Sequence, residues 1–521
     1  MHEKWLELIR HMPNYRLQFE THKSQRKKTL MCSRSPSFPF KVIGILSLAA
    51  CPYAVADPVY QPSGSNLTIG NVSHGGRVQS ASSNPAAAAA NLARSEGKRF
   101  RGTVVSVAAG LEYGNVQNLF DFYDEVTGAY EPSDPGDNDG PVNLPEKPGG
   151  IDLEDIWDSL DPDAQEAASA VAKEVATQVA LLALIQEEGY GKAWLAADAP
   201  FVIDNNYLGG TWTFGVNWSG SSKAYGLTQP IEFDEDEARQ KLQDWLDTLP
   251  INRPELLPIS DDVVLTPNPE QGAIFFSLTN DSSIVTKATQ TTEFDLGYSF
   301  PAWSGDTGSL YLGAEASLYF MKLSRFSVRF GDVTDSEELF DAIGDSEFRN
   351  DEGIGIDVGA LWVSDNYQLG AQFTNINEPG FIFPDVDLEP YSSEGAIEFL
   401  VADQRYTMDR QLKLEASLFT SDRRWSAHVG YDADAATDPM GDRFQWLTVS
   451  GGFTTDSWWL PSGRIGYRQN LAGSKLSYVG IGVTAFKFLN IDISSALDTV
   501  KIDGSTLPQG LMGSIGFQIT W

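Results

Sequence analysis

Apolar and polar residues alternate along much of the C-terminal half of the chain. In Ser309–Phe320 the even-numbered positions, from Leu310 to Phe320, carry apolar side chains or alanine, and most odd-numbered positions are polar. A period of two residues predicts a β-strand with two chemically different faces. This run is long for a soluble strand, and its length suits a tilted span across a membrane.

The same alternation recurs in many other segments. It is clear in Glu293–Phe300, Arg325–Phe330, Ile354–Val363, Tyr367–Asn375, Gln411–Phe419, Arg424–Tyr431, Leu447–Thr454, Arg464–Arg468, Ser477–Phe486, Leu489–Ser494 and Leu511–Trp521. It is weaker in Thr103–Glu112, Thr211–Trp218, Ala224–Gln229, Ala273–Thr279 and Ile284–Gln290. We therefore predict an all-β transmembrane barrel of about 14 to 16 antiparallel strands. A large soluble β-sandwich or propeller is the alternative, because its strands also alternate.

The last of these segments ends on an aromatic residue. Ile515, Phe517, Ile519 and Trp521 share one face of the predicted strand. This pattern resembles the C-terminal signature that the barrel-assembly machinery of Gram-negative bacteria reads. We expect these four residues to form an assembly signal, and the last strand to close the sheet against the first, because lipid does not tolerate a free edge.

The start of the chain has the layout of an export signal. Arg34 and Lys41 precede an apolar run, and the small residues Ala54 and Ala56 fit the −3 and −1 positions of signal peptidase. We therefore assign residues 1–56 to upstream sequence and signal peptide, 57–102 to an N-terminal segment, and 103–521 to the barrel. Leu48-Ala49-Ala50-Cys51 also resembles a lipobox, in which Cys51 would be acylated. Either route exports the chain, and we expect an outer-membrane location.

A helical insertion interrupts the strands near residues 150–190. Apolar residues recur every three to four positions in Leu153–Glu188, and a Pro, Gly and Asp linker, Pro132–Pro148, precedes it. A second helix is expected at Asp234–Leu249. Because one face of Leu153–Glu188 is apolar, it must pack on something. We favour the lumen or rim of the barrel: a filled lumen would favour a structural role, and an open lumen transport.

Composition and charge exclude several functions. The formal net charge is −34, so the chain lacks the basic face with which proteins bind nucleic acid. The only cysteines are Cys32 and Cys51, and the only histidines after residue 56 are His74 and His428. Thiolate and imidazole metal sites are therefore not expected, and no cofactor is predicted. Asp134–Glu146 has some of the spacing of a calcium loop, but Pro135 stands at its first ligand position, so we interpret it as a solvated acidic linker.

The polar faces of the predicted strands carry charged residues that would line the lumen. These candidates are Asp295, Glu315, Arg325, Arg329, Asp357, Lys413, Glu415, Arg424, His428, Arg464, Arg468 and Asp492. They form either a salt-bridged wall or a substrate-selective ladder. His428 lies two residues from Ser426, but any strand places a polar neighbour there, so we assign no catalytic residue and no enzymatic activity.

A family resemblance comes from short motifs and from the layout. Ser83-Asn84-Pro85-Ala86-Ala87-Ala88 is similar to the N-P-A segment of fatty-acid-transporter-like barrels and of the outer-membrane family named after the conjugal-transfer protein TraF. The Asn375-Ile376-Asn377 step before a long loop is also similar to the latter family. The resemblance implies an outer-membrane channel or transporter for small molecules, hydrophobic ones included. Its partners would be outer-membrane lipid and the assembly machinery. The alternative is a structural, secretion- or conjugation-associated surface barrel with a plugged lumen.

Overall fold

The computed structural model divides the chain into two compact units, Met1–Val42 and Ile43–Trp521. It describes residues 62–73, 83–94, 102–114, 189–205, 209–227, 229, 257–258, 263–268, 273–332, 343–344, 346–502 and 505–520. All of these residues belong to the second unit, so everything that follows concerns that unit alone.

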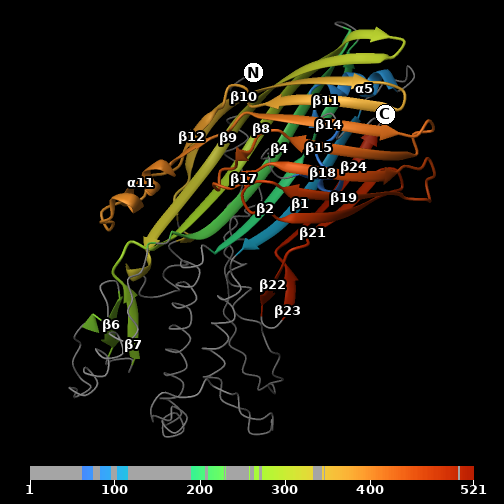
Figure 1. Cartoon of the computed structure of the whole chain (residues 1–521). Coiled ribbons are helices and arrows are strands. Elements are labelled where there is room, and N and C mark those ends of the chain that lie inside the picture. The colour runs from blue at the N-terminus through green and yellow to red at the C-terminus, as the bar shows by residue number, and fades with distance from the viewer. Residues whose placement is uncertain are drawn as a thin grey trace, which may run out of the picture. The chain divides into compact units, whose positions relative to one another are not determined.

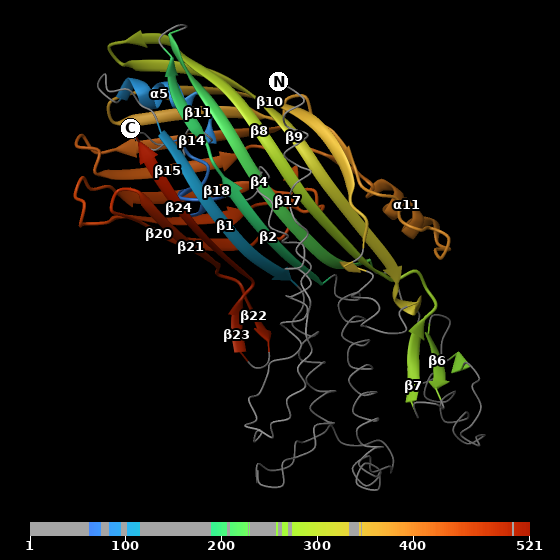
Figure 2. The same ribbon diagram turned by 180° about the vertical axis from the view of Figure 1, so that it is seen from behind.

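Fourteen strands form a closed antiparallel barrel (Figures 1 and 2). In ring order after β1 (Gly102–Gly114) they are β2 (Tyr190–Asp198), β4 (Gly210–Leu227), β8 (Ser283–Gly305), β9 (Gly308–Arg329), β10 (Arg349–Val363), β11 (Tyr367–Thr374), β14 (Gln411–Phe419), β15 (Trp425–Asp432), β18 (Trp446–Phe453), β19 (Ser462–Asn470), β20 (Ser477–Ala485), β21 (Leu489–Ala496) and β24 (Gly510–Thr520). The last strand, β24, pairs with β1, and this pairing closes the ring as predicted.

The second strand of the ring is broken. After β2 ends at Asp198, β3 (Phe201–Asn205) continues in its place, and both pieces pair with β1 and β4. Pro200 stands in the break and has no N–H to give to a ladder. The backbones of Ala199 and Val216 still exchange hydrogen bonds of 3.0 and 3.4 Å. The wall is therefore continuous at the break.

The two faces of the barrel differ as the alternation predicted. Large apolar side chains that remain exposed point outward from nearly every strand, among them Val105, Phe294, Leu296, Leu312, Ile354, Leu414, Val449, Ile465, Ile481, Ile491, Ile515 and Phe517. Buried polar and charged side chains occupy the alternate positions, which face the lumen. An outer apolar band around a polar interior is the pattern of a transmembrane barrel, because lipid covers the outside.

Two kinds of connection join the strands. Short turns such as 306–307, 364–366 and 486–488 join them at one end, here called the short-turn end. Long connections at the other end, the long-loop end, carry further elements. These are β5 (Leu257–Pro258), β6 (Val263–Asn268), β7 (Ala273–Leu278), η2 (Phe330–Asp332), β12 (Gly380–Ile382), α11 (Glu394–Ala402), β13 (Arg405–Thr407), β16 (Ala436–Thr437), β17 (Arg443–Phe444), β22 (Thr499–Ile502) and β23 (Ser505–Pro508). Within the described residues, no helix has the length and apolarity to cross a membrane.

Several strand boundaries differ from those predicted. Three pairs of predicted segments are single long strands: Thr211–Trp218 with Ala224–Gln229 forms β4, Ile284–Gln290 with Glu293–Phe300 forms β8, and Ser309–Phe320 with Arg325–Phe330 forms most of β9. In each pair a polar stretch interrupts the apolar face but not the hydrogen-bonded ladder. The prediction of Ala273–Thr279 as a barrel strand was wrong, because it forms β7 of a separate three-stranded sheet. The predicted helices Leu153–Glu188 and Asp234–Leu249 and the acidic segment Asp134–Glu146 lie outside the described residues.

Candidate functional site

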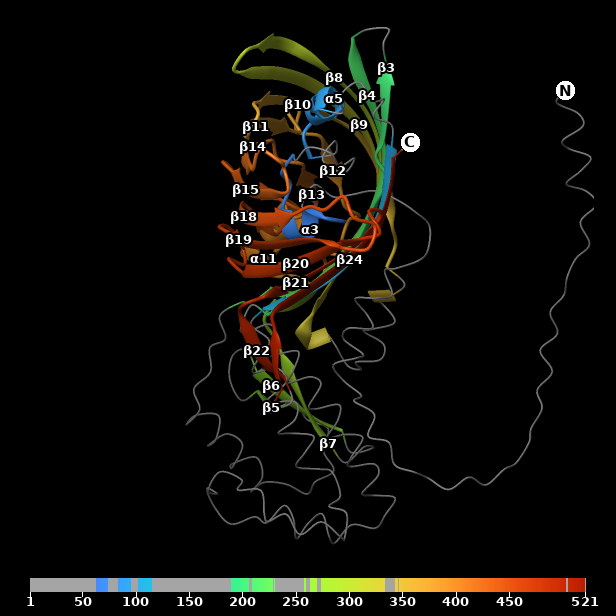
Figure 3. The ribbon, with the colours of Figure 1, turned by 90° about the vertical axis from the view of Figure 1, so that its right-hand side faces the viewer.

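An N-terminal segment lies inside the barrel. Its described parts, residues 62–73 and 83–94, are here called the plug, and Figure 3 shows its two helices surrounded by strands. The first helix, α3 (Asn66–Ile69), is fully buried against β18, β19, β20, β21 and β24. Gly70 ends this helix with φ +78°, a conformation that costs glycine little. Gly466 on the wall allows the close approach, since a Cβ there would lie 1.8 Å from the Thr68 carbonyl oxygen.

The second plug helix is built from small residues. α5 (Ala87–Arg94) begins in a run of alanines, and Ala86 to Ala90 are all buried against β4, β8, β9 and β10. Alanine favours helix, and its methyl group lets the helix backbone lie close to the strands. Gly313 on β9 faces the Pro85 carbonyl, where a Cβ would come within 2.3 Å. The alanines of the N-P-A segment therefore fit the helix to the wall.

Carboxylates of the wall hold the plug in place. The Asp492 side chain accepts a 2.6 Å hydrogen bond from the Thr68 hydroxyl and also pairs with Arg464. Glu415 accepts from the Asn84 side-chain amide at 3.1 Å and from the backbone N–H of Ser73. Residues of β21 and β14 thus act as hydrogen-bond acceptors for segments more than 300 residues away in sequence.

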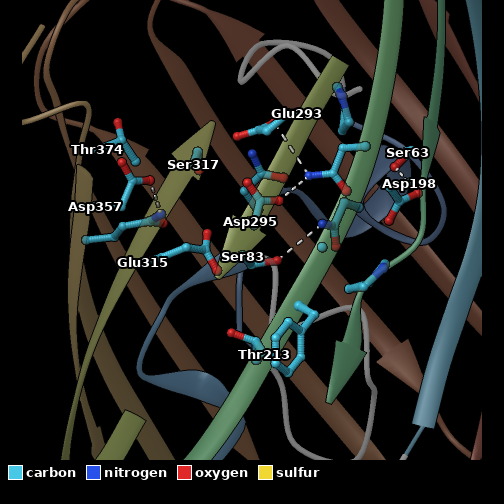
Figure 4. Close-up of a pocket in the computed structure, with 18 of the residues that line it drawn as sticks. Ser63, Ser83, Asp198, Thr213, Glu293, Asp295, Glu315, Ser317, Asp357 and Thr374 are labelled. Carbon is cyan, nitrogen blue, oxygen red and sulfur yellow. Dashed lines mark hydrogen bonds between the residues drawn. The ribbon is translucent and has the colours of Figure 1, made fainter. Parts of the chain in front are cut away.

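A cavity remains between the plug and the wall. Its volume for water-sized molecules is about 100 Å³, and the plug residues Ser63, Asn66 and Ser83 form one side. Four carboxylates, Glu293, Asp295, Glu315 and Asp357, project from β8, β9 and β10 (Figure 4). Lys413 is the one basic residue in its described lining. The cavity is therefore polar and strongly acidic.

The carboxylates of this cavity are closely spaced along the sheet. Glu315 and Asp357 stand directly opposite each other on β9 and β10, an arrangement of like charges that destabilises a sheet. Glu315 makes no hydrogen bond to the described part of the chain, and the Asp295 Oδ1 atom is buried without a donor. No group of three or more His, Cys, Asp or Glu within the described residues could hold a metal ion. The arrangement instead suits small cationic or hydrogen-bonding solutes.

A second cavity lies beside the first and shares Lys413, Pro62 and Asn71 with it. Arg468 on β19 lines this cavity, with its guanidinium 4.7 Å from the centre of the Trp446 ring and 5.2 Å from that of Tyr478. Such stacking is favourable for a guanidinium, whose planar charge is weakly hydrated. The lumen therefore has an acidic wall at β8–β10 and a basic group across from it.

The remaining candidate residues occupy different places. His428 is buried, with its two ring nitrogens 2.8 and 2.9 Å from the hydroxyls of Ser417 and Ser426. Arg325 donates to the Leu400 and Pro384 carbonyls of a long loop, and Arg329 pairs with Asp332. Arg424 is exposed in the turn before β15. Ala54, Ala56 and Trp521 lie outside the described residues, whereas Ile515, Phe517 and Ile519 point outward from β24.

The comparisons with known proteins place the chain in a family. Residues 81–432 match the family model described as "F plasmid transfer operon, TraF, protein". The chain belongs to this TraF family. The match begins just before Asn84-Pro85-Ala86, the segment that packs inside the lumen. No curated protein matches the chain.

Solved structures were also compared with this TraF-family chain. Two are mutants of the TodX monoaromatic hydrocarbon channel. The deltaS2S3 mutant has TM-score 0.39 and 11% identity, and the match covers 89% of this chain and 98% of that chain. The deltaS2 mutant has TM-score 0.37 and 12% identity, and the match covers 88% of this chain and 97% of that chain. Another is a mutant porin of Rh. blastica, with TM-score 0.22, 8% identity and coverage of 81% and 99%.

The TraF-family barrel also has charged lumen residues that the sequence analysis missed. Lys192 and Asp198 project into the lumen from β2, a strand absent from the prediction. The outward positions of β2 are Ala193, Leu195 and Ala197, so its apolar face consists mainly of alanine and the alternation is faint. The charged residues at inward positions were the signal that could have revealed it.

Loop residues complete the charge pattern at the long-loop end. Asp442 lies between β15 and β18 and pairs with Lys192 at 2.8 Å and also with Lys223. Burial opposes ionisation of this carboxyl, but the two ammonium groups, Lys192 first, lower its pKa to about 2. The loop is therefore held by a carboxylate that stays ionised throughout the physiological range.

Proposed function

We propose that this TraF-family protein is an outer-membrane channel for small molecules, closed at rest by its own N-terminal plug. The observation that carries the proposal is the polar cavity between plug and wall, inside a closed barrel with an apolar exterior. In bacterial barrels of this kind the short turns face the periplasm and the long loops face outward. Outer-membrane lipid and the barrel-assembly machinery are then its partners.

The lining of the cavity favours polar solutes over the hydrophobic ones that the sequence resemblance also allowed. A hydrophobic molecule entering beside Glu293, Asp295 and Glu315 would strip water from these groups without replacing the lost hydrogen bonds. A small ammonium- or hydroxyl-bearing solute would replace them. Passage requires the plug to shift, because the plug is packed against β18–β21 and β24 on one side and β4–β10 on the other.

A reversible cross-link between plug and wall tests this proposal. A Cβ on Gly480 would lie 3.4 Å from the Thr68 Cα, so cysteines at both positions come within disulfide reach. The mature protein without residues 1–56 has no other cysteine. In planar bilayers we expect Thr68→Cys/Gly480→Cys to conduct when reduced and to fall silent when oxidised.

The single variants Thr68→Cys and Gly480→Cys are the matched controls, and neither should respond to oxidant. Equal conductance of the oxidised and reduced double variant would contradict passage past the plug. Absence of conductance in every form, with folding confirmed by heat-dependent gel mobility, would contradict a channel function.

A structural or secretion-associated surface barrel is the second candidate. The extent of hydrogen bonding between plug and wall favours it, because Asp198, Glu415 and Asp492 all hold the plug. Under this hypothesis the plug stays in place and the long loops bind a partner. A plug that never moves would leave the reduced cross-link variant as silent as the oxidised one.

A further inference from the structure

Four cations form a continuous row on the lumen side of the wall. Lys192 on β2 stands opposite Lys223 on β4, which stands opposite Lys287 on β8, which stands opposite Arg325 on β9. This row is here called the cationic ladder. Like charges directly opposite each other destabilise a sheet, and each buried charge also loses its hydration. The wall alone therefore disfavours the ladder, and counter-charges must offset it.

The counter-charges come from two long loops. In loop 433–445, Asp438 pairs with Lys192, and Asp442 pairs with Lys192 and Lys223. In loop 375–410, Asp403 at the end of α11 lies 2.5 Å from the Lys287 ammonium and 3.8 Å from the Arg325 guanidinium. Glu112, next to Lys192 in register on β1, is engaged instead by the hydroxyls of Tyr190 and Tyr478.

The same loops exclude water from the ladder. The side chains of Lys192 and Asp438 are only 2% and 3% exposed. Phe444 of one loop lies 4.7 Å from the Lys192 ammonium, and Phe383 of the other lies 4.7 Å from that of Lys287. Phe381, Tyr406 and Met408 extend the cover over the inward face of β9. Removing one partner of an ion pair that is shielded in this way leaves a costly buried charge.

The ladder lies on the route to the cavity. Lys223, Lys287 and Arg325 occupy the same strands as the cavity residues Asn217, Glu293 and Glu315, nearer the long-loop end. A solute that enters from that end must pass the loops first. Loops 375–410 and 433–445 are here together called the lid.

We propose that Asp403, Asp438 and Asp442 latch the lid onto the cationic ladder, making the lid a second gate of the channel at the long-loop end. This proposal rests on the proposed channel function and adds its regulation. Opening separates carboxylates from ammonium and guanidinium groups, so both sets must regain water or find other counter-ions. The closed state is favoured while the latch pairs are complete.

The test removes two latch charges and keeps the shape of the two side chains. Asp438→Asn/Asp442→Asn leaves Lys192 and Lys223 buried without the carboxylates of loop 433–445, so this loop of the lid should release. In planar bilayers we expect the full chain with this change to spend about tenfold more time conducting than the wild type. Trypsin should also cleave faster after Arg443, which lies in the released loop.

The matched control is Asp306→Asn/Asp456→Asn. It removes the same charge from exposed turns at the short-turn end. It should keep wild-type conductance and wild-type cleavage. Unchanged open time and unchanged cleavage in a folded Asp438→Asn/Asp442→Asn barrel would overturn the latch. Equal open time in wild type, control and latch variant, despite faster cleavage, would overturn its role as a gate. If no form conducts but cleavage still accelerates, the channel function fails while the latch stands.

Discussion

Two walls of the lumen treat buried charge in opposite ways. On β19 and β21, Arg464 and Asp492 form a nearly inaccessible pair, and the plug adds the Thr68 hydroxyl to it. On β8, β9 and β10, Asp295, Glu315 and Asp357 line one cavity side by side, and Glu315 stands directly opposite Asp357 in the sheet. The first wall satisfies its charges within the protein and so binds the plug. The second leaves Glu315 and the Asp295 Oδ1 atom without a donor in the described part of the chain, so these atoms are available to a solute.

The largest expected effect comes from breaking the satisfied wall. Asp492→Ala leaves the Arg464 guanidinium buried without a counter-charge, which should lower the free energy of unfolding by about 3–5 kcal/mol. Glu315→Gln removes one of several like charges and should leave that free energy unchanged or raise it. Urea titration followed by gel mobility measures both. Similar losses in the two variants would remove the distinction between the walls.

A second prediction is that the two walls present similar apolar surfaces to lipid and differ only in their inward-facing residues. Leu312 on β9 is 36% exposed and Ile491 on β21 is 44% exposed, and both point toward lipid. Arginine at either position should lower the free energy of unfolding by about 2–4 kcal/mol, the cost of a charge on the lipid face near the bilayer midplane. Unfolding in vesicles measures the two costs, and Glu315→Arg on the inward face of β9 is the control that should be tolerated.

The plug should be bound more tightly to one wall than to the other. Thr68→Val removes a hydrogen bond to the charged Asp492, which we expect to cost about 1.5–3 kcal/mol of plug attachment. Ser299→Ala removes a neutral acceptor of the Ala89 N–H on β8 and should cost about 0.5–1.5 kcal/mol. Hydrogen exchange of the plug amides measures the loss of plug attachment in both variants. A larger loss in Ser299→Ala would mean that the plug is bound more tightly to the wall at β8 than to the wall at β21.

The smallest effect concerns Asp281, a carboxylate that accepts hydrogen bonds from two backbone N–H groups. Asp281 lies before β8, and although burial opposes ionisation, the backbone N–H groups of Ser393 and Ser392 lower its pKa. A lowered pKa means that the contact stabilises the loop above about pH 4, the ordinary aspartate value, and is lost as the pH falls below it. Protease protection of α11 should therefore weaken in acid. Asp281→Asn should show no such pH dependence, and an unchanged acid response would refute the role of Asp281.

Much of the barrel could be predicted from the amino-acid sequence. Alternation identified the lipid face of β9, including Leu312, because the period of a strand is a local property. It also identified Asp295, Glu315, Asp357 and Lys413 as inward residues, and the structure gathers these into one cavity. It missed β2, whose outward face consists mainly of alanine, and it divided β4, β8 and β9 where polar residues interrupt the apolar face.

The sequence by itself determined which residues face lipid, that the first and last strands meet, and that the chain resembles TraF barrels through Asn84-Pro85-Ala86. Only the tertiary structure decided that this segment fills the lumen, that Asp492 holds Thr68, and that Lys192 is matched by Asp438. The physical reason is distance along the chain. Closure of the ring and folding of the loops bring together charges hundreds of residues apart, and no local period records which of them will meet.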